Sequence, residues 1–440
     1  MNLIRRIGGG QPSPACGFVF ACMVLFASRA QAEGASPAAA STLLTRLIDA
    51  VVIAAALPTL IASAYLALLT LMSWKPRPPP ARAPRFRFDI VIPAHDEAEG
   101  IAATVANVLA VDYPSSLKRV IVVADNCSDA TALRAREAGA LVLRREDQAH
   151  RGKGYALAGA FEFVTSGSFA DAVVVVDADT VVSPNLLQAF AAQLERGAVA
   201  VQARYGVRNP GDSWRTSLMA IAFALFHDVR SNAREHLRCS AGLRGNGMCF
   251  ARRLLGEVPH RAFSIVEDVE YGVRLGLAGY RVNFAGDAGV LSDMLTAGRP
   301  SASQRRRWEQ GRAELVHSQA LPLLRRAFSA RSGVLLDLAL DLLVPPLATL
   351  GASAVTGLGL SFLVSGWLGS PLVATWAWAA CLVAISAYVA RGWSISHTGL
   401  RGLASLARAP VYALWKLSLA LRERSHPPGV WIRTPRERRA

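Results

Sequence analysis

Lysine is scarce in this chain of 440 residues, although the chain is strongly basic. The formal net charge is +16, so arginine carries almost all of the positive charge. The lysines are Lys75, Lys118, Lys153 and Lys416. A basic balance suits nucleic acid, anionic lipid or phosphorylated substrates. The excess charge falls largely beside apolar segments and in the tail, so we expect contact with membrane lipids and no nucleic-acid partner.

The cysteines show no pattern of disulfide bonds or of metal binding. The six cysteines stand at positions 16, 22, 127, 239, 249 and 381, without the spacing of a zinc site or a disulfide scaffold. A reducing compartment for the middle of the chain is the simplest interpretation. Internal repeats and long low-complexity tracts are also missing from the sequence.

Hydrophobic residues are abundant, at 52% of the chain with a mean hydropathy of +0.29, which favours partial residence in a membrane. Residues 1–32 have the pattern of a signal peptide. Cleavage of that segment and its retention as a first transmembrane helix both remain open. The run 47–74 exceeds the roughly 20 apolar residues that span a bilayer. The basic, proline-rich linker 75–87 follows it, and the positive-inside rule places that linker in the cytoplasm.

The stretch 88–316 has the character of a soluble α/β domain. Short β-branched runs alternate with helical stretches, which predicts βαβ units in a doubly wound, mostly parallel sheet. Two further transmembrane or interfacial helices are expected within 334–390, at 334–363 and 371–390. Because two spans return the chain to its starting side, the basic amphipathic tail 391–440 is expected in the cytoplasm too.

Acidic side chains follow successive predicted strands. Glu97 follows the first strand, Asp125 the second, and Asp177 and Asp179 follow the fourth, in "VVVVDADT". Each alone suits a turn or a helix N-cap. Since parallel strands end at one edge of a sheet, together they predict a site there. Carboxylates as close as Asp177 and Asp179 repel unless a cation or a proton lies between them, which indicates a divalent metal.

Three later stretches add charged groups. "HRGKGYAL" places Lys153 at a helix start that can hold a diphosphate, although a solvated turn also explains it. "SIVEDVEYG" places Asp268 at a helix start, where it suits a general base or simply the helix dipole. "SQRRRWEQGR" suits either a wall against a pyrophosphate and a sugar ring or a basic surface near the membrane.

"VVVVDADTV" also matches the nucleophile motif of haloacid-dehalogenase-like phosphatases. Those enzymes need a downstream cation, most often lysine, and no lysine occurs between Asp179 and Lys416. Their nucleophile also usually follows the first strand of the core, whereas about three strands precede it here. The phosphatase hypothesis is therefore set aside.

The motifs taken together resemble the family 2 (GT-A) glycosyltransferases, in the membrane-bound branch of cellulose, hyaluronan and poly-N-acetylglucosamine synthases. The resemblance spans about Phe88 to Arg312. Its motifs, in order, are "PAHDE", "VADNCSD", "GKGYAL", "DADT", "GNGMCFARR", "VEDVEYG" and "QRRRW". It implies a cytoplasmic GT-A domain with a Rossmann-like sheet and flanking transmembrane helices.

The resemblance also implies roles for individual residues. Asp268 is implied as the catalytic base, and Asp179 with Asp177 as the ligands of Mg²⁺ or Mn²⁺. The implied donor-binding residues are Pro93, Glu97, Asp125, Lys153, Asp177, Gln304, Arg307 and Trp308. The implied acceptor-side residues are Gly245, Asn246, Gly247, Glu267 and Trp308.

The expected function is inverting transfer of a hexose-type sugar from a nucleotide sugar, UDP-linked by the resemblance, to a growing polysaccharide through a β-linkage. The expected place is the cytoplasmic face of a bacterial inner membrane, in a multi-pass protein. Cellulose-making relatives usually have more C-terminal spans, which weakens the case for a long translocated polymer. One alternative is transfer of a single sugar to a lipid-linked acceptor. An alternative of another class is a non-catalytic membrane scaffold.

Overall fold

The computed structural model describes residues 37–78, 80, 83–294 and 298–410, with side chains from residue 41 and with those of 298–309 left undescribed. The expected signal-like segment 1–32 and the tail beyond residue 410 lie outside the described residues. The described chain forms two compact units. One comprises residues 37–64 with Pro346–Ala384, and the other comprises the residues from Tyr65 to Pro345 with those from Ile385 onward.

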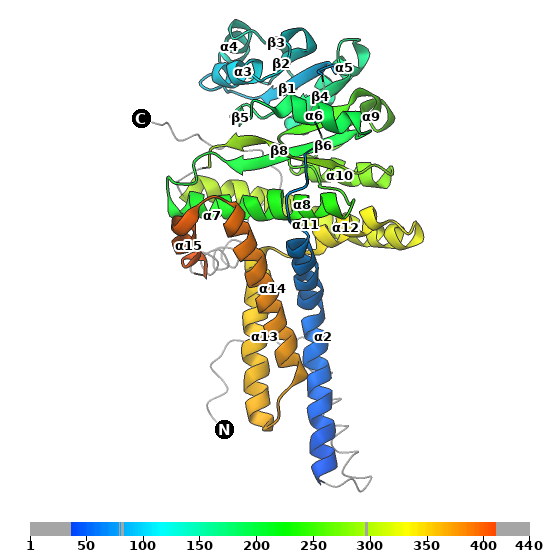
Figure 1. Ribbon diagram of the computed structural model, residues 1–440, viewed down its shortest axis with the longest axis vertical. Coiled ribbons are helices and arrows are strands. Elements are labelled where there is room, and N and C mark those ends of the chain that lie inside the picture. The colour runs from blue at the N-terminus through cyan, green and yellow to red at the C-terminus, as the bar shows by residue number, and fades with distance from the viewer. Residues whose placement is uncertain (1–36, 79, 81–82, 295–297, 411–440) are drawn as a thin grey trace. The chain divides into compact units, whose positions relative to one another are not determined.

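The first unit is built from α13 (Leu347–Leu368) and from the parts of α2 (Pro37–Leu71) and α14 (Val373–Ile395) up to Ala64 and Ala384, and these helices lie side by side in Figure 1. All three are long and apolar enough to cross a membrane. The Asp49 carboxylate of α2 accepts hydrogen bonds from the first backbone N–H groups of α14, those of Val373 (3.2 Å) and Ala374 (2.8 Å). These bonds satisfy N–H groups that a helix start leaves without a partner.

The apolar stretch expected at 334–363 is two helices. They are α12 (Gly333–Leu343) and α13, and Pro345 with Pro346 separates them. Proline lacks a backbone N–H and clashes with the preceding turn, which explains why the helix is broken at these two consecutive prolines. Residues 334–343 therefore do not belong to a membrane-spanning helix.

The second unit contains an eight-stranded sheet in the order β3-β2-β1-β4-β7-β6-β8-β5. The strands are β1 (Phe88–Ala94), β2 (Lys118–Asp125), β3 (Leu141–Arg145), β4 (Ala172–Val175), β5 (Thr180–Val182), β6 (Ala200–Val207), β7 (Met248–Ala251) and β8 (Asn283–Ser292). The expected α/β fold is confirmed, and the sheet is mixed. β1 is parallel to β2 and β4, β2 to β3, and β6 to β8, whereas β7 is antiparallel to both neighbours and β5 to β8.

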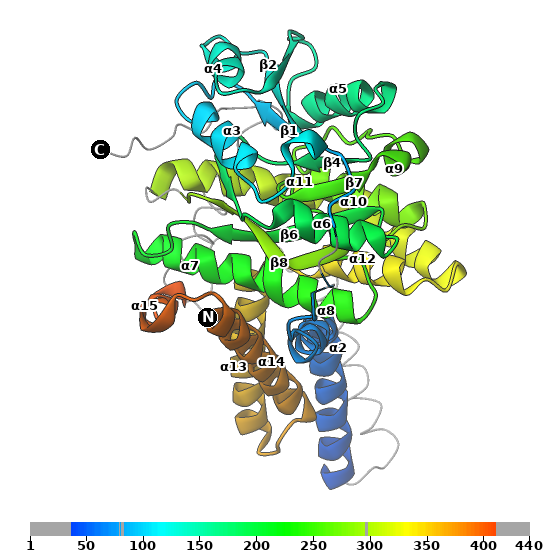
Figure 2. The ribbon, with the colours of Figure 1, turned by 45° about the horizontal axis from the view of Figure 1, so that its top comes forward.

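Helices cover both faces of the sheet (Figure 2). α3 (Ile101–Leu109), α4 (Thr131–Glu137) and α6 (Leu186–Glu195) pack on the face that Ile90 and Ile92 of β1 line. α5 (Lys153–Ser166), α9 (Arg252–Glu257) and α10 (Glu267–Leu277) pack on the face that Val91 lines. Successive strand residues point to opposite faces, so the apolar run of β1 supplies both cores.

The same unit contains a helical layer that ionic contacts hold together. Its elements are α7 (Trp214–Phe223), the π-helical turn η2 (Ala224–Val229), α8 (Arg230–His236), α11 (Gly298–Ser329), α12 and α15 (Gly399–Leu406), whereas the short turn η1 (Ser115–Leu117) lies directly before β2. The Asp341 carboxylate of α12 accepts from Arg230 and Arg234 of α8, each at 2.7 Å, and Arg234 also pairs with Asp337 at 3.2 Å. Burial opposes ionisation of Asp341, but the surrounding arginines hold its pKa well below the usual range.

Candidate active site

The carboxyl ends of β1, β2 and β4 lie at one edge of the sheet, because these strands are parallel and in register. Ala94 is paired with Ala124, and Val91 with Val175. Asp125 is the last residue of β2, and Glu97 and Asp177 follow β1 and β4 closely. Pro93 is the penultimate residue of β1.

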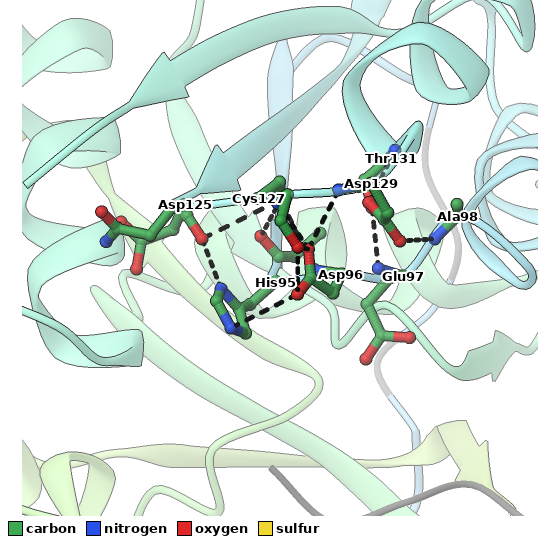
Figure 3. A network of polar contacts seen from close by, with 11 residues as sticks. His95, Asp96, Glu97, Ala98, Asp125, Cys127, Asp129 and Thr131 are labelled. Carbon is green, nitrogen blue, oxygen red and sulfur yellow. Dashed lines mark hydrogen bonds and ion pairs between the residues drawn. The ribbon is translucent and has the colours of Figure 1, made fainter. Parts of the chain in front are cut away.

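The loops after β1 and β2 are tied to each other (Figure 3). His95 Nδ1 forms a 2.7 Å hydrogen bond with the Asp125 carbonyl, and the Glu97 backbone N–H donates to Thr131 Oγ1 at 2.7 Å. Asp96 and Asn126 have φ values of 54° and 51°, in the left-handed region that a sharp turn requires. Both loops are therefore held rigidly beside Asp125.

Asp125 does not act alone at this edge. Its buried carboxylate accepts from Arg145 Nη1 at 2.7 Å and from the Asn126 amide at 3.1 Å. Arg145 also pairs with Asp147 at 2.9 Å. No sequence motif marks Arg145, but it ends β3 beside Asp125 in the register of β2 and β3. The Asp125 carboxylate is therefore already paired with a guanidinium in this structure.

Lys153 connects the two acidic parts of the site. It begins α5, and its ammonium group pairs with Asp177, donates to the Gly245 carbonyl at 2.6 Å and lies 3.9 Å from Glu267 Oε1. A Cβ on Gly245 would lie 3.5 Å from both Lys153 Nζ and Asp268 Oδ2. The structure thus brings together five residues that the sequence predicted for donor, acceptor and base.

The electrostatics of this cluster keep Lys153 charged. Burial opposes the charge, but the carboxylates of Asp177 and Glu267 outweigh it and raise the pKa of Lys153. Burial raises the pKa of Glu267 to about 8, although Lys153 opposes the rise. Burial also raises the pKa of the Asp268 carboxyl. A raised carboxyl pKa near neutral pH suits a group that takes up a proton.

The Asn246 side chain is fully enclosed and supports the acidic turn. Its oxygen accepts from the Asp177 backbone N–H at 3.1 Å, and its nitrogen donates to Thr180 Oγ1 at 2.7 Å. Gly247 has a φ of 66°, and a Cβ there would lie 2.9 Å from the Val290 side chain. Both ends of the Asn246 amide therefore have partners in the described chain, and the place of Asn246 on the acceptor side stays a prediction.

Two residues that no motif marked lie near Asp179. Burial raises the pKa of Tyr205, and the carboxylates of Asp177 and Asp179 add to the rise. Arg208, directly after β6, pairs with Asp293, and the pKa of Arg208 is raised by that bond and further by Asp179. Arg208 is thus a cation within electrostatic reach of the acidic turn.

The donor set of the turn suits a hard divalent cation. Asp177 and Asp179 flank Ala178 and offer only carboxylate oxygen, which Mg²⁺ and Mn²⁺ prefer. Lys153 already binds Asp177, so a cation at this turn would share that carboxylate with the ammonium group. Gln304, Arg307 and Trp308 lie in α11, within the part of that helix whose side chains are not described.

Residues 84–311 match the family model described as "Glycosyltransferase like family 2". The chain belongs to this family. The predicted enzyme class is confirmed at that level, whereas the cellulose and hyaluronan synthase branch is not. Among curated relatives, the beta-monoglucosyldiacylglycerol synthases of Synechocystis sp. and Trichormus variabilis are 28% and 29% identical over 230 residues, which is 50% of this chain and 47% and 48% of theirs. The chain therefore spans about half the length of the curated relatives it matches.

Solved structures are similar at lower identity. A mannosyltransferase from Pyrobaculum calidifontis in complex with GDP-Man and Mn²⁺ is 18% identical, with a TM-score of 0.46 over 86% of this chain and 99% of that one. Glucosyl-3-phosphoglycerate synthase from Mycobacterium tuberculosis in complex with Mn²⁺, UDP and phosphoglyceric acid is 24% identical, with a TM-score of 0.34 over 50% and 75% of the two chains.

Proposed function

We propose that this family 2 glycosyltransferase moves one sugar from a nucleotide sugar to a lipid acceptor at a membrane, forming a β-linked glycolipid. The observation that carries the proposal is the cluster in which Lys153 joins Asp177 to Glu267, beside Asp268. The relatives named as glucosyldiacylglycerol synthases and the three apolar helices support a lipid acceptor over a polysaccharide.

The residues of the cluster divide the reaction between them. Asp268 takes the proton of the attacking hydroxyl, whose oxygen bonds to the anomeric carbon as the bond from that carbon to the diphosphate oxygen breaks. Asp177 and Asp179 would hold Mg²⁺ or Mn²⁺, which offsets the charge of the departing diphosphate when bound. Lys153 keeps Asp177 oriented and supplies fixed positive charge beside that group.

Asp125, Arg145 and Glu97 form the nucleoside end of this proposal. The Asp125 carboxylate offers hydrogen-bond acceptors and the Arg145 guanidinium offers donors. The edge of a uracil ring, which has an N–H group and carbonyl oxygens, can bind both. We assign the donor as a uridine nucleotide sugar on that ground, in agreement with the expectation from the motifs. Gln304, Arg307 and Trp308 stay proposed contacts to donor and acceptor.

The membrane arrangement follows from the helices and the linker. Three helices are apolar enough to span a bilayer, and the basic linker 75–87 connects the end of α2 to β1. By the positive-inside rule the catalytic domain then faces the cytoplasm, in a multi-pass protein of a bacterial inner membrane.

The test is incorporation of label from a panel of nucleotide sugars into membranes that contain the full chain. One labelled product that extracts into organic solvent is expected, and a ladder of long water-soluble products would favour the polysaccharide function instead. Asp179→Asn and Asp268→Asn should each remove most of the product. Asp287→Asn, on an exposed position of β8, is the matched control. If no nucleotide sugar is consumed, the alternative of a non-catalytic membrane scaffold would be favoured.

A further inference from the structure

Arg244 is a guanidinium without an acidic partner beside the candidate base. Its Nη2 donates to the carbonyls of Ala241 (3.1 Å) and Phe226 (3.4 Å), and its Nε is buried without a partner. None of the ion pairs among the described residues involves Arg244. Arg204 and Arg281, which are also half-buried, each have a carboxylate partner, Asp228 and Glu235 respectively.

The charge around Arg244 is unbalanced. Arg230, Arg234, Arg244 and Arg312 all act on Asp341, and among the described residues the other carboxylates that act on these arginines are Asp337 and Asp268. Arg312 donates to backbone carbonyls at the end of α12, as Arg244 does to those of Ala241 and Phe226. Burial, together with Arg234 and Arg230, lowers the pKa of Arg244 to about 10, although Asp341 and Asp268 oppose this. An anion beside Arg244 would relieve this excess of positive charge.

The location of Arg244 connects it with the acceptor. The next residue, Gly245, faces Asp268 and Lys153, and Arg244 in turn lowers the pKa of Asp268. In the proposed function the donor diphosphate lies at Asp177 and Asp179, so Arg244 is not needed for that group. A guanidinium binds phosphate through paired N–H groups more specifically than an ammonium does.

We propose that Arg244 binds a phosphate group of the acceptor lipid, next to the hydroxyl that Asp268 deprotonates. This inference rests on the proposed lipid acceptor and narrows its class to a phosphate-bearing lipid with a free hydroxyl. The relatives whose names refer to diacylglycerol would then differ from this chain in the charge of the acceptor.

The experiment compares two lipids with identical acyl chains, phosphatidylglycerol and diacylglycerol, as acceptors for the reconstituted full chain. Both carry free hydroxyl groups, and phosphatidylglycerol differs from diacylglycerol by its phosphoglycerol headgroup, which supplies the phosphate. The phosphatidylserine content is lowered in the phosphatidylglycerol vesicles by the amount of phosphatidylglycerol added, so that the surface charge of the two kinds of vesicle is equal. The wild-type kcat/KM should favour phosphatidylglycerol by about tenfold or more, the range of a charged hydrogen bond. Arg244→Gln should reduce that ratio to about one, and Arg244→Lys should retain part of it.

Arg252→Gln is the matched control, because Arg252 also donates to a backbone carbonyl, that of Thr165 at 2.8 Å, at the opposite edge of the sheet. It should leave the ratio unchanged. If Arg244→Gln lowers kcat/KM equally for both lipids, Arg244 acts only by lowering the pKa of Asp268, and the inference is overturned. A changed KM for the nucleotide sugar, with the ratio kept, would place the anion on the donor and overturn it too. Transfer to neither lipid, with polymer formed instead, would refute the lipid acceptor itself.

Discussion

Asn246 holds Asp177 in place, since its side-chain oxygen accepts a hydrogen bond from the Asp177 backbone N–H at 3.1 Å. Its nitrogen donates to Thr180 Oγ1, so a single buried amide fixes the chain on both sides of Ala178 and Asp179. The orientation of both acidic side chains therefore depends on a residue that contacts neither carboxylate.

Asn246→Ala should weaken the metal site more than the fold. Loss of partners that orient ligands lowers metal affinity about 10- to 100-fold, and an unsatisfied buried group costs about 1–3 kcal/mol. Titration of the detergent-solubilised full chain with Mn²⁺, followed by calorimetry, measures the affinity. Asn185→Ala is the control, because the Asn185 amide donates only to the Asp287 carbonyl. Unchanged Mn²⁺ affinity with lowered stability would show that Asn246 is only structural.

The strand–helix order and the acidic edge could be predicted from the sequence, because both follow from local patterns. Runs of valine that end in carboxylates predict buried parallel strands. The carboxyl ends of parallel strands lie at one edge of the sheet. The amide of Asn246 could not be placed, since its partners Asp177 and Thr180 lie 69 and 66 residues away. The strands β5, β6, β7 and β8 were not predicted, because β5 and β7 are only 3 and 4 residues long and glycine and charged residues interrupt the apolar pattern of β6 and β8.

Asp337 and Asp341 show the limit of hydropathy most directly. In the sequence they are charges that intrude into an apolar stretch expected to enter the membrane. In the structure they pair with Arg230 and Arg234, more than 100 residues earlier in the chain. Composition counts such charges, but only the fold shows that arginines from another helix neutralise them.

Lys153→Met should abolish most of the activity. Without the ammonium group, the Asp177 carboxylate loses its cation and the Gly245 carbonyl loses its donor, so the donor side of the site is disturbed. We expect a fall in kcat of about 100-fold or more, the scale of a lost electrostatic contact in an active site. Nucleotide release at saturating donor measures it. Lys118→Met is the control, because the Lys118 ammonium group donates to the Val111 carbonyl at 2.7 Å. The kcat of this variant should stay close to that of the wild type.

Glu267 should make stability depend on pH. Its pKa is about 8 in the folded protein and near 4.5 ordinarily, so between these values the folded state holds a proton that the unfolded chain has released. Stability should therefore fall as the pH rises from about 4.5 to about 8 and level off above that. Glu267→Gln should remove most of this slope in thermal unfolding scans, whereas Glu162→Gln, on an exposed position of α5, should not. If Glu267→Gln keeps the full dependence of stability on pH and only Asp268→Asn removes it, the proton is held by Asp268.

Asp341→Asn should destabilise the catalytic unit far more than the loss of a surface pair. Arg230 and Arg234, whose side chains are 3% and 1% exposed, would lose the carboxylate that they share at 2.7 Å. Removing one partner of a buried pair costs about 3–5 kcal/mol, because the remaining charge stays buried. Asp171→Asn at the exposed Arg87 pair should cost about 1 kcal/mol or less. Denaturant unfolding in detergent, followed by tryptophan fluorescence, compares the two. Equal losses would mean that water reaches Arg230 and Arg234 once Asp341 is neutral, and the ionic layer would then contribute little to holding α8 on α12.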